Sequence, residues 1–207
     1  MRKKLILLIS VIFLMGNIGC LMNKQENRKL LLSYMENKYQ EEFVYKESYA
    51  GQYGAEYTYA VLESTDYPGW EILARVTWID GLVCYEDNYP AYLLQGKIES
   101  EMKRIAGEYF GNCHVTYQIP QFVFPKQFGA DTTVEAFLSS KEVNAEILIM
   151  PEVQCSREVW ERNLEEFRKE LADKGYYVRG AVLGEKGELI FSIGECGEFG
   201  YMRWLEP

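Results

Sequence analysis

Histidine is almost absent from this 207-residue chain, in which His114 stands alone. A histidine-rich metal site is therefore excluded, and any Ser-His-Asp or Cys-His arrangement would depend on this one residue. Its neighbour Cys113 would not form a dyad with it in a strand, because adjacent strand residues point to opposite faces. No Cys-x-x-Cys pair exists either, so thioredoxin-like and zinc-ribbon sites have no support. We expect no metal and no cofactor.

Positive charge is also scarce, with 22 basic against 31 acidic side chains. Residues 1–19 hold three of the basic ones, which leaves 19 basic and 31 acidic residues and a net charge of −12 in the remainder. Such a surface repels phosphate backbones and anionic lipid headgroups. We therefore expect no nucleic-acid partner, and we do not expect the globular part to lie flat on an anionic membrane.

The N-terminus has a basic start, Met1-Arg2-Lys3-Lys4, followed by an apolar stretch from Leu5 to Met15. After it comes Asn17-Ile18-Gly19-Cys20. This segment resembles the signal peptide and lipobox of bacterial lipoproteins, although Asn17 stands where leucine is usual. The resemblance implies cleavage before Cys20, a diacylglyceryl group on its thiol, and a location at the outer face of the cytoplasmic membrane. The layout looks like that of lipoproteins of Gram-positive bacteria.

Two alternatives for this segment stay open. Residues 5–22 are nearly long enough to span a bilayer as an uncleaved helix. A plain secretory signal is the other alternative, although its small-x-small cleavage site is poorly formed. All three interpretations place the globular part outside the cytoplasm. If Cys20 is lipidated, burial of acyl chains contributes about 0.8 kcal/mol per CH₂, and two chains give durable anchoring.

Four further cysteines lie in the remaining chain: Cys84, Cys113, Cys155 and Cys196. Outside the cytoplasm an even number is compatible with two disulfides. Buried free thiols are the favoured interpretation, because a domain of this size builds a core without disulfides. Cys84 and Cys155 lie in or beside apolar runs, which also favours burial.

Hydrophobic periodicity predicts an α+β protein in which antiparallel meanders pack against amphipathic helices, in two helix-plus-meander halves. We expect helices over residues 24–41, about 90–110, 132–140 and 156–175. We expect strands over residues 42–50, 56–64, 70–79, 82–85, 113–119, 145–150, 176–183, 188–193 and 201–205. The expected organisation is a signal peptide (1–19), a lipidated cysteine with a polar tether (20–29), and two α+β halves (30–112 and 113–207), which together could form one domain.

The unusual feature of the sequence is a group of regularly spaced tyrosines. Five tyrosines occupy odd positions in and between the first two strands, and odd positions share a face in extended chain; they are Tyr45, Tyr49, Tyr53, Tyr57 and Tyr59. Tyrosine suits binding surfaces because it offers a large contact area and a hydroxyl at low entropic cost. The alternative is that these rings form the packing face of the sheet against the first helix.

The function favoured by these observations is a non-enzymatic, membrane-tethered domain that binds an envelope protein or a cell-wall component. One alternative is a cell-wall hydrolase with two carboxylates, for which Glu56, Glu63 and Asp66 lie near aromatic strands. Another is a structural or inhibitory module that adds a strand to a partner. A cleft holding carboxyl groups of raised pKa would favour the first alternative, and an uncovered sheet edge would favour the second.

Overall fold

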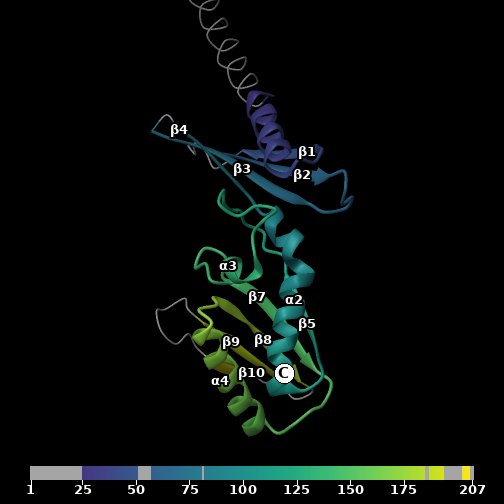
Figure 1. The fold of residues 1–207 in the computed structure, drawn as a ribbon, viewed down its shortest axis with the longest axis vertical. Helices are drawn as coiled ribbons and strands as arrows, with labels where there is room; N and C mark the ends of the chain where they lie inside the picture. The colour runs from purple at the N-terminus through teal and green to yellow at the C-terminus, as the bar shows by residue number, and fades with distance from the viewer. Residues whose placement is uncertain (1–24, 51–56, 81, 185–186, 194–201, 206–207) are drawn as a thin grey trace, which may run out of the picture. The chain divides into compact units, whose positions relative to one another are not determined.

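The computed structural model describes residues 25–50, 57–80, 82–184, 187–193 and 202–205 (Figure 1). The α+β class predicted from sequence is confirmed. The chain divides into two compact units, Met1–Asp87 and Asn88–Pro207. This differs from the division between residues 112 and 113 suggested by the sequence. The reason is helix α2 (Tyr89–Phe110), whose apolar face contributes Leu94, Ile98 and Met102 to the core of the second unit.

The first unit is a helix packed on an antiparallel sheet. The helix is described over residues 25–39. The strands follow one another in space as they do in sequence: β1 (Phe43–Ala50), β2 (Tyr57–Ser64), β3 (Ile72–Ile79) and β4 (Leu82–Asp87). Leu31 and Met35 of the helix are fully buried, as are Leu62 and Ile72 of the sheet. One face of the sheet is therefore the core face, and it is covered by the helix (Figure 1).

A β-bulge interrupts the alternation of β1. Tyr45 pairs with Leu62, but Glu47 pairs with Val61, so the register shifts by one residue at Lys46. An extra residue reverses which face the later side chains occupy. Residues of β1 before Lys46 and after it therefore do not follow one odd–even rule.

The second unit combines helices with a sheet of order β10-β9-β8-β7-β5. Its elements after α2 are β5 (Cys113–Gln118), β6 (Phe124–Pro125), α3 (Val134–Leu138), β7 (Ala145–Pro151), α4 (Arg157–Asp173), β8 (Val178–Gly184), β9 (Gly187–Ser192) and β10 (Met202–Leu205). Strands β7 and β8 are parallel, with α4 as the crossover between them. The C-terminal meander expected from sequence is present as β8, β9 and β10, and β7 joins it through a βαβ unit, since parallel neighbours require such a connection.

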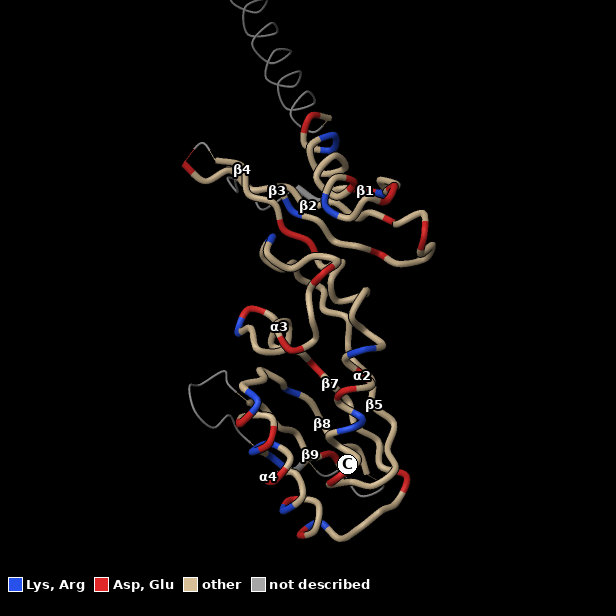
Figure 2. The backbone as a smooth tube through the Cα atoms, viewed as in Figure 1, with Lys and Arg blue, Asp and Glu red and all other residues tan. Residues whose placement is uncertain are grey.

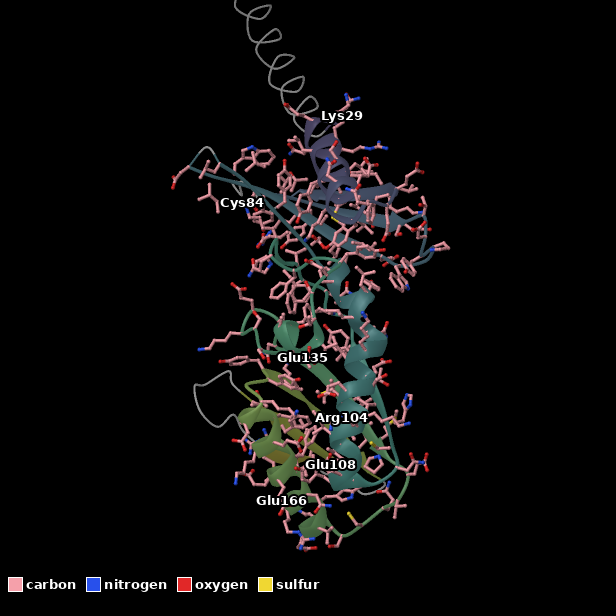
Figure 3. The ribbon with its side chains drawn as sticks, in the orientation of Figure 1. Lys29, Cys84, Arg104, Glu108, Glu135 and Glu166 are labelled. Carbon is pink, nitrogen blue, oxygen red and sulfur yellow. The ribbon has the colours of Figure 1, made fainter. Side chains whose placement is uncertain are left out.

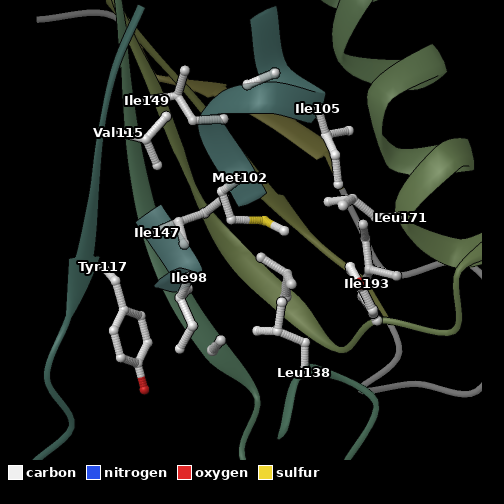
Figure 4. Close-up of a cluster of buried hydrophobic side chains, with 14 of the residues drawn as sticks. Ile98, Met102, Ile105, Val115, Tyr117, Leu138, Ile147, Ile149, Leu171 and Ile193 are labelled. Atoms are coloured by element: carbon white, nitrogen blue, oxygen red, sulfur yellow. The ribbon is translucent and has the colours of Figure 1, made fainter. Parts of the chain in front are cut away.

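The core of the second unit lies between its helices and one face of its sheet (Figure 4). Helix α4 buries one apolar stripe: Trp160, Leu164, Phe167 and Leu171. Strand residues at alternate positions, such as Ile147 and Ile149, face the same core. Because α2 and α4 contribute to a single cluster, both helices cover the same face of this sheet.

Charged residues of both signs alternate along the outer sides of α2 and α4 (Figure 2). Arg157 pairs with Glu161 at 2.8 Å, and Arg168 with Glu165 at 2.7 Å. The first pair is exposed at both ends and contributes little to stability, whereas the Arg168 side chain of the second pair is only 12% exposed. No helix in the described ranges is long and apolar enough to cross a membrane.

Candidate functional site

Several residues singled out from the sequence lie outside the described ranges. They are Cys20 with its lipobox, Tyr53, Glu56 and Cys196. The lipidation of Cys20 therefore stays a prediction from sequence.

The bulge at Lys46 distributes the remaining tyrosines over both faces of the first sheet. Tyr45 pairs with Leu62, which is on the core face, and its ring lies 4.5 Å from the guanidinium of Arg28 on the N-terminal helix. The backbone of Tyr49 pairs with that of Tyr59, whose own side chain lies on the other face. Tyr45 therefore does not share a surface with the later tyrosines, and the expected single tyrosine face is wrong at this position.

Tyr57 and Tyr59 do form part of one surface. Their rings meet edge to face at 5.4 Å, and both are half-buried. Arg75 lies over the two rings, and it donates a hydrogen bond of 3.1 Å to the Tyr59 hydroxyl. Glu86 accepts from the same guanidinium in an ion pair. Because Arg75 is already engaged by Glu86, this cluster presents aromatic faces and a compensated charge rather than a free cation.

A buried carboxylate lies on the core face of the same unit. Asp87 is fully buried and accepts hydrogen bonds from Lys38 Nζ at 2.7 Å, Tyr39 Oη at 2.6 Å and Tyr34 Oη at 3.2 Å. Burial, together with the Asp87 carboxylate, holds the pKa of Tyr34 well above its usual value. Three donors on the helix satisfy one carboxylate at the end of β4, so this cluster fastens helix to sheet rather than offering a reactive group.

A cleft of about 550 Å³ lies along the second sheet. Its side-chain lining includes alternate residues of β7 and β9 that do not face the helices, such as Glu146, Leu148 and Ile190. The polar groups that line it are Gln118, Glu146, Arg179 and Glu188. The Arg179 guanidinium is paired with the Glu146 carboxylate at 3.0 Å, and both side chains are exposed. The cleft thus presents acceptors, donors and charges of both signs around an apolar floor.

A second cavity of about 250 Å³ shares Gln118, Glu146 and Arg179 with the cleft, so the two adjoin. Tyr117 lines it, is 2% exposed, and has a buried hydroxyl with no hydrogen-bond partner among the described residues. Figure 4 shows this hydroxyl directed away from Val115 and Ile149. Burial raises the pKa of Tyr117 well above its usual range, so the group is a neutral donor.

Sequence reasoning missed this cleft, although one signal was present. In β7 the residues facing the helices, Ile147 and Ile149, alternate with Leu148 on the opposite face. A strand that is apolar on both faces is expected to be covered on both. Leu148 therefore indicated that the second face of the sheet is also a contact surface. That Ile190 and Arg179 lie beside Leu148 on this face follows only from the strand order.

Cysteine and histidine give no site in the described part of the chain. Cys84, Cys113 and Cys155 are free thiols. Cys113 is buried, which raises its pKa, but Cys155 is exposed, contrary to the burial expected from its sequence context. His114 is exposed on β5. No cluster of three potential metal ligands occurs among the residues described.

The carboxylate-hydrolase alternative gains no support from the described residues. Among the acidic groups considered for it, Glu63 is paired with Lys46, whose hydrogen bond holds the pKa of this carboxyl below its usual value. Asp66 lies in the exposed connection between β2 and β3. Elsewhere, hydrogen bonds from Arg104 to Glu101, and from the residue's own backbone to Glu158, also lower carboxyl pKa values. A general acid requires a shift in the opposite direction.

Two sheet edges carry features that oppose the addition of a further strand. The edge strand β1 carries the bulge and the charged residues Lys46 and Glu47. At the edge strand β5, the Tyr117 amide donates to the Glu99 carboxylate of α2 at 3.1 Å. Bulges, charges and covering groups are the means by which proteins protect edges from further pairing.

Comparisons with known proteins add one distant likeness. No family model matches the chain, and no curated protein matches it. A solved structure of a DUF5037 family protein from Ruminococcus gnavus ATCC 29149 aligns over 73% of this chain and 72% of its own, with a TM-score of 0.37 and 15% identity. A likeness at this TM-score carries no argument about function.

Proposed function

We propose that this chain is a lipoprotein tethered at the outer face of the cytoplasmic membrane, where it binds a ligand without catalysing a reaction. The tether is Cys20, supported by the basic start, the apolar stretch and the Gly19-Cys20 pair. The binding site is the cleft on the second sheet. That cleft is the observation that carries the proposal, because it gathers few polar groups around an apolar floor, the usual character of a ligand site.

The chemistry of the cleft favours a peptide-like ligand, from an envelope protein or from a cell-wall component. Gln118 can pair with an amide, while Arg179 and Glu146 can each exchange their mutual pairing for a ligand charge. Leu148 and Ile190 provide apolar contacts beside them. An extended chain that carries amides, charges and apolar side chains would satisfy these groups together.

Crosslinking and pull-down from intact cells tests the binding. Ile190→Asp places a charge on the cleft floor and should abolish recovery of the ligand. Val153→Asp is the matched control, because Val153 is 70% exposed and does not line the cleft. Equal recovery with both variants would contradict the assignment of the cleft. Degradation of cell-wall polymer by the purified protein, with no partner recovered, would instead favour the hydrolase.

Cell fractionation tests the tether separately. Cys20→Ala removes the acceptor thiol, so the protein should leave the membrane fraction and appear in the medium. Retention of the variant in the membrane fraction would identify an uncleaved N-terminal helix as the anchor.

A further inference from the structure

The turn between β3 and β4 carries an exposed apolar tip, which we define as Trp78, Ile79, Leu82 and Val83. Leu82 is 70% exposed, Ile79 54% and Val83 41%, while Trp78 is half-buried. Three large aliphatic side chains left in water on one short ribbon are an unfavourable arrangement unless something covers them.

The apolar residues of the tip occupy both faces of the ribbon. Ile79 pairs with Leu82 on one face, and Trp78 pairs with Val83 on the other. A hairpin that docks on a protein surface needs only one apolar face, and its other face is normally polar. Apolar side chains on both faces fit immersion in a surrounding nonpolar medium. A tryptophan behind aliphatic residues is also the arrangement found at membrane interfaces.

Contacts within the first unit place the start of the N-terminal helix three residues along β3 from the tip. Lys38, near the end of the helix, bonds Asp87 at the end of β4, and Tyr34, one turn earlier, stacks on Tyr85 at 4.6 Å. From Tyr34 back to Asn27 the helix crosses the sheet from β4 to β2, because Tyr85 pairs with Val76 and Val76 with Thr58. At the start of the helix, Asn27 bonds Thr58, which pairs with Val76 three residues before Ile79.

The proposed tether is close in sequence to the start of the helix. Residue 25, where the described helix begins, is five residues after Cys20 in the sequence. At roughly 3.6 Å per residue, they span about 18 Å at most. A lipid on Cys20 would therefore hold the start of the helix close to the bilayer surface, and the tip is three strand residues, roughly 10 Å, away along β3.

We propose that the hairpin tip inserts shallowly into the outer leaflet of the membrane to which Cys20 tethers the chain. This inference rests on the proposed tether. The turn residue Asp80, which is exposed and has a positive φ of 51°, limits the depth because its carboxylate stays among headgroups and water. The acidic remainder of the protein stays off the leaflet, so the tip is a point contact that orients the first unit.

The test uses the protein purified from membranes with its anchor and reconstituted into phosphatidylcholine vesicles that contain nitroxide-labelled lipid. An environment-sensitive fluorescent amino acid is incorporated at position 83, or at position 66 as the control. Position 66 lies in the exposed connection between β2 and β3, at the opposite end of β3. We expect blue-shifted, quenched emission at position 83 and unchanged emission at position 66.

Two variants sharpen the result at position 83. Leu82→Ser should abolish the quenching, and Asp80→Asn should strengthen it, because the turn then carries no charge. Vesicle flotation distinguishes failure of the tip insertion from failure of the tether. If the protein floats with the vesicles but emission is equal at both positions, only the insertion of the tip is contradicted. If the protein does not float, both the insertion and the tether are contradicted. A dimer in vesicle-free detergent solution that Leu82→Ser dissociates would assign the tip to a second copy and overturn the membrane contact.

Discussion

The Tyr117 hydroxyl is a buried donor without a partner in the described chain, beside the cavity that adjoins the cleft. Leaving such a group unpaired is unfavourable by about 1–3 kcal/mol. Tyr117→Phe removes that penalty, so we expect the free energy of unfolding to be unchanged or to rise by about 1 kcal/mol. If the ligand accepts a hydrogen bond from this hydroxyl, the same variant binds more weakly. Denaturant unfolding and ligand recovery measure the two effects, and a clear loss of stability would contradict the unpaired state.

The Tyr109 hydroxyl joins α2 to α4 by donating to the Glu170 carboxylate at 2.7 Å. This hydrogen bond, with burial and the nearby charges of Glu170, Glu108 and Glu166, raises the pKa of Tyr109 to about 12. Figure 3 shows Glu108 on α2 and Glu166 on α4. The folded protein thus holds this proton more tightly than the unfolded chain, whose tyrosine pKa is about 10.

The contribution of Tyr109 to stability is therefore complete below about pH 10 and is lost as the pH rises toward 12. We expect Glu170→Gln to lower the pKa of Tyr109, because the carboxylate that opposes deprotonation is gone. Carbon-13 NMR of the tyrosine ring carbon bonded to oxygen follows this titration. An unshifted Tyr109 in the wild-type protein would be inconsistent with the interhelical bond.

Asp87 and Lys38 form the most buried ion pair of the first unit, with side chains 0% and 13% exposed. Asp87→Ala would leave the Lys38 ammonium buried without its counter-charge and remove the acceptor for two tyrosine hydroxyls. We expect a loss of about 3–5 kcal/mol. The matched control is Lys46→Ala, which breaks the more exposed pair with Glu63 and should cost about 0–1 kcal/mol. Hydrogen exchange of β2–β4 amides measures both, and equal effects would contradict the assigned roles.

Among the elements, β1 offers a test of register because its bulge adds one residue. Deleting Lys46 removes the extra residue, and Tyr45 still pairs with Leu62 and Glu47 with Val61. We expect a change within about 1 kcal/mol, from the lost surface ion pair. Deleting Val44 instead must either turn Phe43 off the core face or turn Lys46 onto it. Exposing one buried aromatic side chain costs about 1.5–3 kcal/mol.

The side chains of Val44 and Lys46 are both exposed. The two deletions therefore differ in their effect on the register of β1 and not in the loss of a buried side chain. Thermal unfolding of the two deletion variants is the measurement. If removal of Lys46 proves as damaging as removal of Val44, the bulge is not where we place it.

The extent of the elements was predictable from sequence because most follow local periodicity and turn residues. The helices α2 and α4 and the α+β class were predicted in this way. What escaped prediction depends on the pairing of strands. The bulge at Lys46 has no sequence signature, and the parallel pairing of β7 with β8 follows from where α4 packs. The cleft appears only when β7, β8 and β9 are brought together.

For the whole molecule, the division at Asp87 separates two proposed tasks. The first unit carries the N-terminal segment and the exposed hairpin tip, and the second carries the cleft. From the sequence, α2 was placed with the first half, because a helix that follows a meander can cover one face of its sheet and form a stable two-layer arrangement. The apolar face of α2 is instead completed by β5, β7 and α4.

The central claim is that Cys20 tethers a binding domain to the membrane, and the mass of the N-terminal peptide from membrane-purified protein tests it most directly. We predict a mature chain that begins at Cys20 and carries a diacylglyceryl group on its thiol. A chain that begins at Met1, or an unmodified N-terminus downstream of Cys20, would contradict the lipoprotein account.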